Sequence, residues 1–275
     1  MKTSRKFSPQ PHPLVSAIPA FSDNYIWLIR APGSDWAAVV DPGDAAPVEA
    51  ALDRAQLRLA AILLTHHHAD HVGGVERLRK LGHPKVFGPR GEAIDGIDQR
   101  CGEGDTIVVP GLDLELSVLD VPGHTRGHIA YVAKRFGEDP RPMLFCGDTL
   151  FAAGCGRLFE GTPEQMLASL GKLMALAPDT LVYCAHEYTL SNLRFAAAVE
   201  PDSEEVGARL AEVREQRELG EATVPSAIGV ELGTNPFLRS HLPSVQRAAA
   251  DRLGHAPAAN ADAFAAIREW KNVFR

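Results

Sequence analysis

The feature that most constrains this chain is the run T-H-H-H-A-D-H at residues 65–71, which directly follows a short apolar segment. Imidazole nitrogens and carboxylate oxygens are ligands that transition metals accept in proteins. If the chain stays extended there, His66 and His68 share one face, because alternate residues of a strand point the same way. We expect this pair to bind one ion. The glycine pair at 73–74 predicts a turn that directs Asp70 and His71 toward a second ion.

The same alternation predicts that His67 points away from the ion held by its two neighbours. A histidine-rich run can also be a purification tag or a solvated loop. Tags lie at chain ends, whereas this run is internal and carries an aspartate and two glycines. We therefore interpret residues 65–71 as a metal site.

Apolar periodicity divides the chain into two parts. A loose, proline-rich arm is expected at 1–13, and a mixed α/β domain over 14–186 is followed by a helical domain over 187–275. Strands are predicted from residue 15 and at 25–29, 37–40, 59–64, 85–87, 106–109, 112–119, 129–132, 143–146 and 181–184. Helices are predicted at 45–58, 75–81, 162–176, 191–199, 203–219, 242–253 and 261–274.

The charge and the cysteine content limit the expected partners and the expected cellular compartment. The 275 residues carry a formal net charge of -7 and no extended basic cluster, so nucleic acid is not an expected partner. No apolar run is long enough to span a membrane, which predicts a cytoplasmic protein, although the basic start leaves a transit peptide as an alternative. The cysteines lack C-x-x-C spacing, which favours buried, reduced thiols over a disulfide framework. They are Cys101, Cys146, Cys155 and Cys184.

Three further metal-ligand side chains each follow an apolar run, as the first cluster does. These are His124, Asp148 and His186. Strand ends at one edge of a sheet are where α/β proteins assemble their sites, so we expect these side chains to join the first cluster. Two metal ions that share an oxygen need about seven protein ligands, and the two sets together supply that number.

These motifs identify a family. The pattern T-H-H-H-x-D-H-x-G-G, with Gly-His, Gly-Asp and a late histidine behind it, resembles the metallo-β-lactamase superfamily, whose fold is an αββα sandwich. Within that superfamily the chain resembles the glyoxalase II family, the hydroxyacylglutathione hydrolases. The segments I-P-A-F-S-D-N-Y, C-G-D-T-L-F, G-C-G-R, H-E-Y-T and N-P-F-L-R carry this resemblance, which covers nearly the whole chain after residue 13.

The resemblance implies a catalytic centre with two divalent ions, zinc first and iron or manganese as alternatives. His66, His68 and His124 would hold the first ion, Asp70, His71 and His186 the second, and Asp148 would bridge them. Asp70 and Asp148 are the catalytic carboxylates. A hydroxide shared by the ions would hydrolyse S-D-lactoylglutathione to D-lactate and glutathione, the second step of methylglyoxal detoxification. We further expect Asp41 and His128 to support ligands, and the protein to be a monomer acting on a small molecule.

Glutathione recognition is expected to use Arg157, Phe159, Tyr188 and Arg239, the positions that match the family. The chain departs from the family pattern where Phe159 replaces a frequent tyrosine and where Leu242 replaces a basic residue. The alternative enzymes on this fold are a glutathione-persulfide dioxygenase with one iron, a lactonase and a β-lactamase. A metal-storage protein is the alternative without catalysis.

Overall fold

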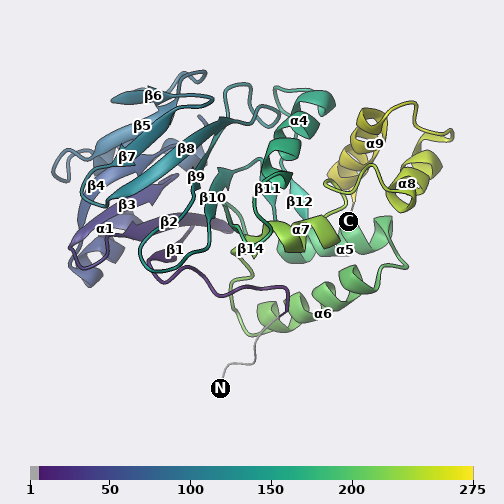
Figure 1. The fold of residues 1–275 in the computed structure, drawn as a ribbon, viewed down its shortest axis with the longest axis horizontal. Helices are drawn as coiled ribbons and strands as arrows, with labels where there is room; N and C mark the ends of the chain where they lie inside the picture. The colour runs from purple at the N-terminus through teal and green to yellow at the C-terminus, as the bar shows by residue number, and fades with distance from the viewer. Residues whose placement is uncertain (1–5, 275) are drawn as a thin grey trace.

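The computed structural model describes residues 6–274, and two six-stranded sheets form most of its first part (Figure 1). The first sheet has the order β1 (Val15–Ala20), β2 (Asn24–Arg30), β3 (Trp36–Val40), β4 (Arg58–Leu63), β5 (Lys85–Pro89), β6 (Gln99–Cys101). The second has the order β14 (Ser226–Ala227), β13 (Leu181–Cys184), β10 (Met143–Gly147), β9 (Ile129–Ala133), β8 (Leu114–Asp120), β7 (Thr106–Val109). Every strand range predicted from the sequence lies within two residues of an observed strand at each end.

Strand β2 shows why the two sheets pack face to face. Trp27 and Ile29 are buried in the core between the sheets, whereas Ile26 and Leu28 are buried in a separate cluster on the other face. Alternate side chains of one strand thus serve two apolar layers. The second cluster contains residues of α1 (Ala45–Ala55) and α3 (Val75–Leu78), while α4 (Pro163–Met174) packs on the second sheet. This arrangement confirms the αββα sandwich.

A helical region follows the sandwich, as predicted. It comprises α5 (Thr189–Val199), α6 (Glu204–Glu218), α7 (Ile228–Thr234), α8 (Pro243–Leu253) and α9 (Asn260–Val273). These helices gather at one end of the sandwich (Figure 1). Phe195 lies at the centre of an aromatic cluster, with ring centroids 5.9 Å from Phe237 and 5.2 Å from Trp270. The cluster joins α5 to α9, so the last helix is fixed against the region that precedes it.

Two local expectations were wrong. The arm expected at 1–13 is packed in its described part: the amide of Phe7 donates to Glu212, and His12 is buried. Residues 1–5 lie outside the described part of the chain. The helix expected at 75–81 ends at Leu78, and a short helix α2 (Ala69–Val72) precedes it, because glycine residues interrupt the segment on both sides.

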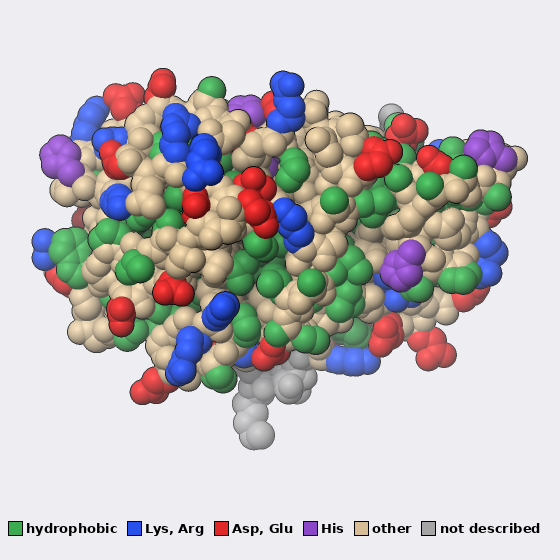
Figure 2. Space-filling view, turned by 45° about the horizontal axis from the view of Figure 1, so that its top comes forward, with side chains coloured by type: hydrophobic (Ala, Val, Ile, Leu, Met, Phe, Trp, Pro, Cys, Tyr) green, Lys and Arg blue, Asp and Glu red, His purple; other side chains and the backbone are tan. Residues whose placement is uncertain are grey.

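The surface charge is mixed, and the cysteines are buried. On the face shown in Figure 2, basic and acidic side chains are interspersed, with no broad area of one sign. Within residues 6–274, helices of the length and apolarity needed to cross a bilayer are absent. All four cysteines are buried and free, which confirms the prediction of packed thiols.

Candidate active site

The predicted ligand residues follow the ends of core strands, most of them in loops, with Asp70 and His71 in the short helix α2. His66 follows β4, His124 follows β8, Asp148 follows β10, and His186 follows β13. The sheets therefore fix where each loop starts. Close approach of these loops requires a glycine at position 147, which has φ +47° and where a Cβ would collide with the side chains of Thr65 and His128.

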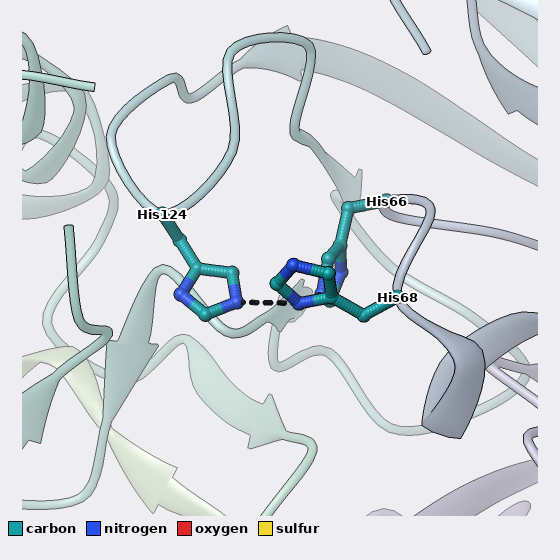
Figure 3. Close-up of side chains that lie close together, drawn as sticks. All are labelled: His66, His68 and His124. Atoms are coloured by element: carbon teal, nitrogen blue, oxygen red, sulfur yellow. Dashed lines mark hydrogen bonds between the residues drawn. The ribbon is translucent and has the colours of Figure 1, made fainter. Parts of the chain in front are cut away.

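One group consists of three imidazoles. Nε2 of His66 and Nε2 of His124 each lie 3.0 Å from Nδ1 of His68. Figure 3 shows the rings of His68 and His124 turned toward each other, from loops of different sheets. Burial, together with the neighbouring imidazoles, lowers the pKa of His66 well below its usual range. His66 is therefore neutral at pH 7, the state in which an imidazole coordinates a metal ion.

A second group lies beside the first. One ligand atom from each of Asp70, His71 and His186 falls within 4.8 Å of the others, as is also true of the three imidazoles above. Asp148 stands between the groups. Its Oδ1 is 3.5 Å from Nε2 of His71 and 3.4 Å from Nε2 of His186, and its Oδ2 is 3.5 Å from Nε2 of His124.

Several polar atoms at this junction suit a bound cation. Nε2 of His71 and Oδ1 of Asp148 are buried and have no hydrogen-bond partner among residues 6–274. Leaving such atoms unpaired is costly unless they bind something. Although burial opposes it, the neighbouring His71 and His186 hold the pKa of Asp148 well below its usual range, so the carboxylate is ionised. Imidazoles around an ionised carboxylate fit a divalent metal of the first transition row.

A further layer of contacts fixes these groups. Asp41 accepts hydrogen bonds from the amide and hydroxyl of Thr65 at 2.8 and 2.7 Å and lies 3.1 Å from Nδ1 of His71, as expected for a residue that orients a ligand. Nε2 of His128 accepts the Asp148 amide at 3.2 Å. His128 therefore holds the loop of Asp148.

Asp23, in the turn before β2, and Asn24, the first residue of that strand, were not assigned a role from the sequence. Oδ1 of Asp23 lies 2.8 Å from Nδ1 of His186, and the Asn24 amide donates to Asp70 at 3.0 Å. The sequence signal that could have indicated a role for them is their place in I-P-A-F-S-D-N-Y, one of the segments that carry the family resemblance. Both residues orient members of the second group.

A cavity of about 560 Å³ opens beside the two groups. Of the residues expected to contact substrate, Arg157, Phe159 and Tyr188 line it, together with His68, Asp70, His124, Asp148 and His186. The Tyr188 ring stacks on His186 with centroids 4.7 Å apart and an interplanar angle of 3°. The volume falls in the range typical of small-molecule sites.

Helix α9 supplies the far wall of this cavity, which sequence reasoning missed. Arg268, Lys271, Asn272 and Phe274 all line it. Lys271 is half-buried, with Nζ 3.0 Å from the Ser191 hydroxyl. Burial, together with the charges of Arg268 and Arg157, lowers the pKa of Lys271 to about 8. Three cationic side chains thus face the cavity from two separate segments, which suits an anionic substrate.

Arg239 does not take part in this wall. Its guanidinium donates to both carboxylate oxygens of Glu200, at 2.8 and 2.9 Å, and it lines a different cavity with Ser244 and Arg247. The expectation that Arg239 lies at the substrate site is therefore corrected, because a buried carboxylate already binds it. Leu242, the second departure from the family pattern, is the residue before α8 and likewise does not line the substrate cavity.

The hairpin of β11 (Leu150–Phe151) and β12 (Gly154–Cys155) connects Asp148 to the cavity wall, and side chains of the helical region hold it. Glu231 accepts the Ala153 amide at 2.7 Å, Asn235 donates to the Gly154 carbonyl at 2.9 Å, and Arg268 donates to the Cys155 carbonyl at 2.7 Å. The helical region therefore also orders the loop between the metal-ligand residues and the cavity.

Comparison with protein families matches both parts of the chain. The model of the metallo-beta-lactamase superfamily matches residues 21–186, and the model of the hydroxyacylglutathione hydrolase C-terminus matches residues 187–274. A hydroxyacylglutathione hydrolase of Alkalilimnicola ehrlichii is 57% identical over 258 residues, covering 94% of this chain and 98% of that protein. One from Cupriavidus taiwanensis is 55% identical over 269 residues, covering 95% and 99%.

Solved structures with the same fold are more distant in sequence. ETHE1 from Myxococcus xanthus superposes with a TM-score of 0.65 at 24% identity, covering 95% of this chain and 92% of that one. The BLEG-1 B3 metallo-beta-lactamase superposes with a TM-score of 0.60 at 23% identity, covering 82% and 99%. At these identities the similarity shows the fold alone.

Proposed function

The chain belongs to the hydroxyacylglutathione hydrolases, thioester hydrolases of the metallo-beta-lactamase superfamily, and on that basis we propose that it converts S-D-lactoylglutathione and water to D-lactate and glutathione. The observation that carries the proposal is the position of Asp148, which contacts both groups of ligand-type side chains at one end of a cationic cavity. The high identity to curated hydrolases favours this reaction over a persulfide dioxygenase, a lactonase or a β-lactamase.

The residues present fit two divalent ions. We propose that His66, His68 and His124 hold one, that Asp70, His71 and His186 hold the other, and that Asp148 contacts both. Zinc suits this mixed set of nitrogen and oxygen donors, and iron and manganese suit it as well. Divalent ions held there would make water a competent nucleophile at neutral pH.

Several of the ligands already have the charge state that metal binding requires. His71, whose Nε2 lies 3.5 Å from Oδ2 of Asp70, lowers the pKa of Asp70 well below its usual range, so Asp70, like Asp148, is anionic at pH 7. The neutral His66 keeps its lone pair for coordination. Asp41 and Asp23 fix the ring planes of His71 and His186. Although burial opposes it, neighbouring carboxylates raise the pKa of His71 and of His186, so these imidazoles would lose a proton when a metal ion binds.

The cavity binds the rest of the substrate in this proposal. Glutathione carries two carboxylates, and Arg157, Arg268 and Lys271 are the cationic side chains that face the cavity. Phe159 and Tyr188 flank its metal end and contact the thioester. In the reaction, water oxygen forms the new C–O bond, the C–S bond breaks, and the sulfur of glutathione takes the remaining proton.

We further propose a division of labour at residue 186. Residues 14–186 supply all the proposed metal ligands, His186 included, and the region from 187 onward supplies Tyr188 and the α9 side chains of the cavity. We propose that the protein works as a monomer, since one chain lines the cavity, and that it is cytoplasmic, as its buried free cysteines favour. Sedimentation of the purified protein tests this.

Turnover of S-D-lactoylglutathione by protein of known metal content tests the function. We expect hydrolysis that disappears after removal of the metal with a chelator and returns when zinc, iron or manganese is added. Persulfide oxidation with oxygen uptake, and β-lactam or lactone hydrolysis, serve as control reactions. A fully metal-loaded protein that fails to hydrolyse the glutathione thioester would contradict the proposal.

A further inference from the structure

His67 stands between the metal-ligand residues His66 and His68 but belongs to neither ligand group. Its ring is held on both sides by carboxylates. Nδ1 donates a hydrogen bond to Glu92, and Nε2 lies 3.5 Å from Oε1 of Glu160. Both carboxylates come from other loops. An imidazole in this position connects its own loop to two others.

The Glu92 side chain is 3% exposed and reaches the loop of His124. Its Oε1 accepts the Thr125 hydroxyl at 2.6 Å and the Gly127 amide at 3.0 Å. The two loops are in backbone contact there, since a Cβ at Gly127 would collide with the backbone of Gly91. Glu92 therefore joins the loop of His66 and His68 to the loop that carries the third imidazole of the same group.

Glu160 extends these contacts to the substrate cavity. Its Oε2 accepts the Arg126 amide at 3.0 Å, which is a second link to the His124 loop. Glu160 follows Phe159, whose ring lies 5.7 Å from that of His68 and 5.3 Å from that of His124. The side chain of His67 thus lies where the two imidazole loops and the cavity wall meet.

We propose that His67 and Glu92 are positioning residues that set the separation of the His66–His68 loop and the His124 loop, and thereby the affinity of the three-imidazole site for its metal ion. This inference rests on the proposed function, which places a metal there. The loop of His66 and His68 follows a strand of the first sheet, and the loop of His124 follows a strand of the second sheet. The three imidazoles therefore meet across a gap between two loops. The buried carboxylate of Glu92 spans it. Partners of this kind typically change metal affinity by about 10–100-fold.

Metal retention in graded chelator concentrations tests the proposal, with metal content per chain as the readout. We expect His67→Ala to release one of its ions at a chelator concentration about 10–100-fold lower than the wild type does. His67→Asn keeps a donor near the position of Nδ1, so it should recover most of that loss. His255→Ala removes an exposed imidazole outside the contacts described and should match the wild type.

Thermal unfolding of the metal-free proteins separates positioning from a merely structural role. A positioning role predicts similar Tm values for metal-free wild type and His67→Ala, with a smaller rise on metal addition in the variant. Glu92→Gln keeps the volume of the side chain and tests the same link if His67→Ala does not fold. Wild-type retention by both His67→Ala and Glu92→Gln would overturn the proposal, as would a lack of recovery in His67→Asn.

Glu160→Gln distinguishes the two sides of His67. Because Glu160 follows Phe159 of the cavity wall and its side chain is more exposed than that of Glu92, this change should raise the KM for the thioester and lower metal retention less than Glu92→Gln does. A wild type that binds no metal or hydrolyses no glutathione thioester would contradict the proposed function itself. If the wild type binds metal and hydrolyses the thioester, and the His67 and Glu92 variants retain metal as the wild type does, only the positioning role is contradicted.

Discussion

Oδ1 of Asp148 lies 3.4 Å from Nε2 of His186, although the two residues leave different strands of the second sheet. Strands β10 and β13 are parallel neighbours, so both side chains emerge at the same edge. The other oxygen of the same carboxylate faces His124. Asp148 therefore contacts members of both ligand groups through its two oxygens, and its removal should affect both metal positions.

The substitution Asp148→Ala should lower the metal content from two ions per chain to one or none and reduce thioester hydrolysis by more than about 100-fold. The fold should persist, since the contacts of the Asp148 side chain are to ligand imidazoles and not to the apolar core. Elemental analysis and circular dichroism check the two parts. Retention of two ions by Asp148→Ala would show that the carboxylate does not join the sites.

The pKa of Lys271 predicts a pH dependence of substrate binding. Burial and the neighbouring Arg268 and Arg157 lower this pKa to about 8, so Lys271 is cationic at pH 7 and loses its charge as the pH rises through 8. A cavity that binds carboxylates through this charge becomes weaker above that pH. We expect kcat/KM for the thioester, which reports the free enzyme, to fall between about pH 7.5 and 9.

Lys271→Arg provides the matched control, because a guanidinium stays charged throughout this range. The fall in kcat/KM near pH 8 should be absent in this variant, and Lys271→Met should show a high KM at every pH. Steady-state kinetics from pH 6 to 9.5, corrected for spontaneous thioester hydrolysis, provide the measurement. An unchanged profile in Lys271→Arg would assign the titration to another group.

The metal-ligand residues could be predicted from the sequence because each follows an apolar strand, and strand ends at one sheet edge are constrained to meet. Their observed proximity agrees with the prediction, while metal binding by these residues stays a proposal. The α9 side chains could not be predicted in this way. Lys271 reaches the cavity only because aromatic residues such as Phe195 fix α9 against α5. This contact depends on tertiary packing, which the helical spacing of apolar residues in the sequence does not predict.

The position of Arg239 outside the substrate cavity could not be predicted for a similar reason. The motif N-P-F-L-R suggested a substrate contact, but the pairing of Arg239 with Glu200 depends on how the end of α5 meets the segment before α8. The short elements β6 and α7 were missed for a simpler reason. Segments of a few residues contain too few periods of hydrophobic alternation to be distinguished from loops.

Arg239→Met should therefore reduce stability and leave substrate binding unchanged. The change would leave the buried Glu200 without its guanidinium partner, with only the Ser244 hydroxyl at 2.7 Å, so a loss of about 1–3 kcal/mol is expected. Urea unfolding and steady-state kinetics measure the two effects. A rise in KM comparable to that of Lys271→Met, without a loss of stability, would restore Arg239 to the substrate site.

The ion pair of Arg209 and Glu231 predicts a larger effect on stability. The guanidinium lies 2.7 Å from Oε1 of Glu231, and the two side chains are 1% and 0% exposed. Arg209→Met would leave an unpaired buried carboxylate, which costs about 3–5 kcal/mol. The same carboxylate accepts the Ala153 amide, so the hairpin beside the cavity should loosen as well. Urea unfolding and hydrogen exchange at residues 150–155 measure these effects.

The double variant Arg209→Met/Glu231→Gln is the control for this prediction. A neutral glutamine leaves no buried charge and can still accept the Ala153 amide, so much of the lost stability should return. If the double variant is as unstable as Arg209→Met alone, the cost arises from packing around Arg209 and not from the unpaired carboxylate. If Arg209→Met costs less than about 1 kcal/mol, the pair does not tie α6 to α7 as its burial indicates.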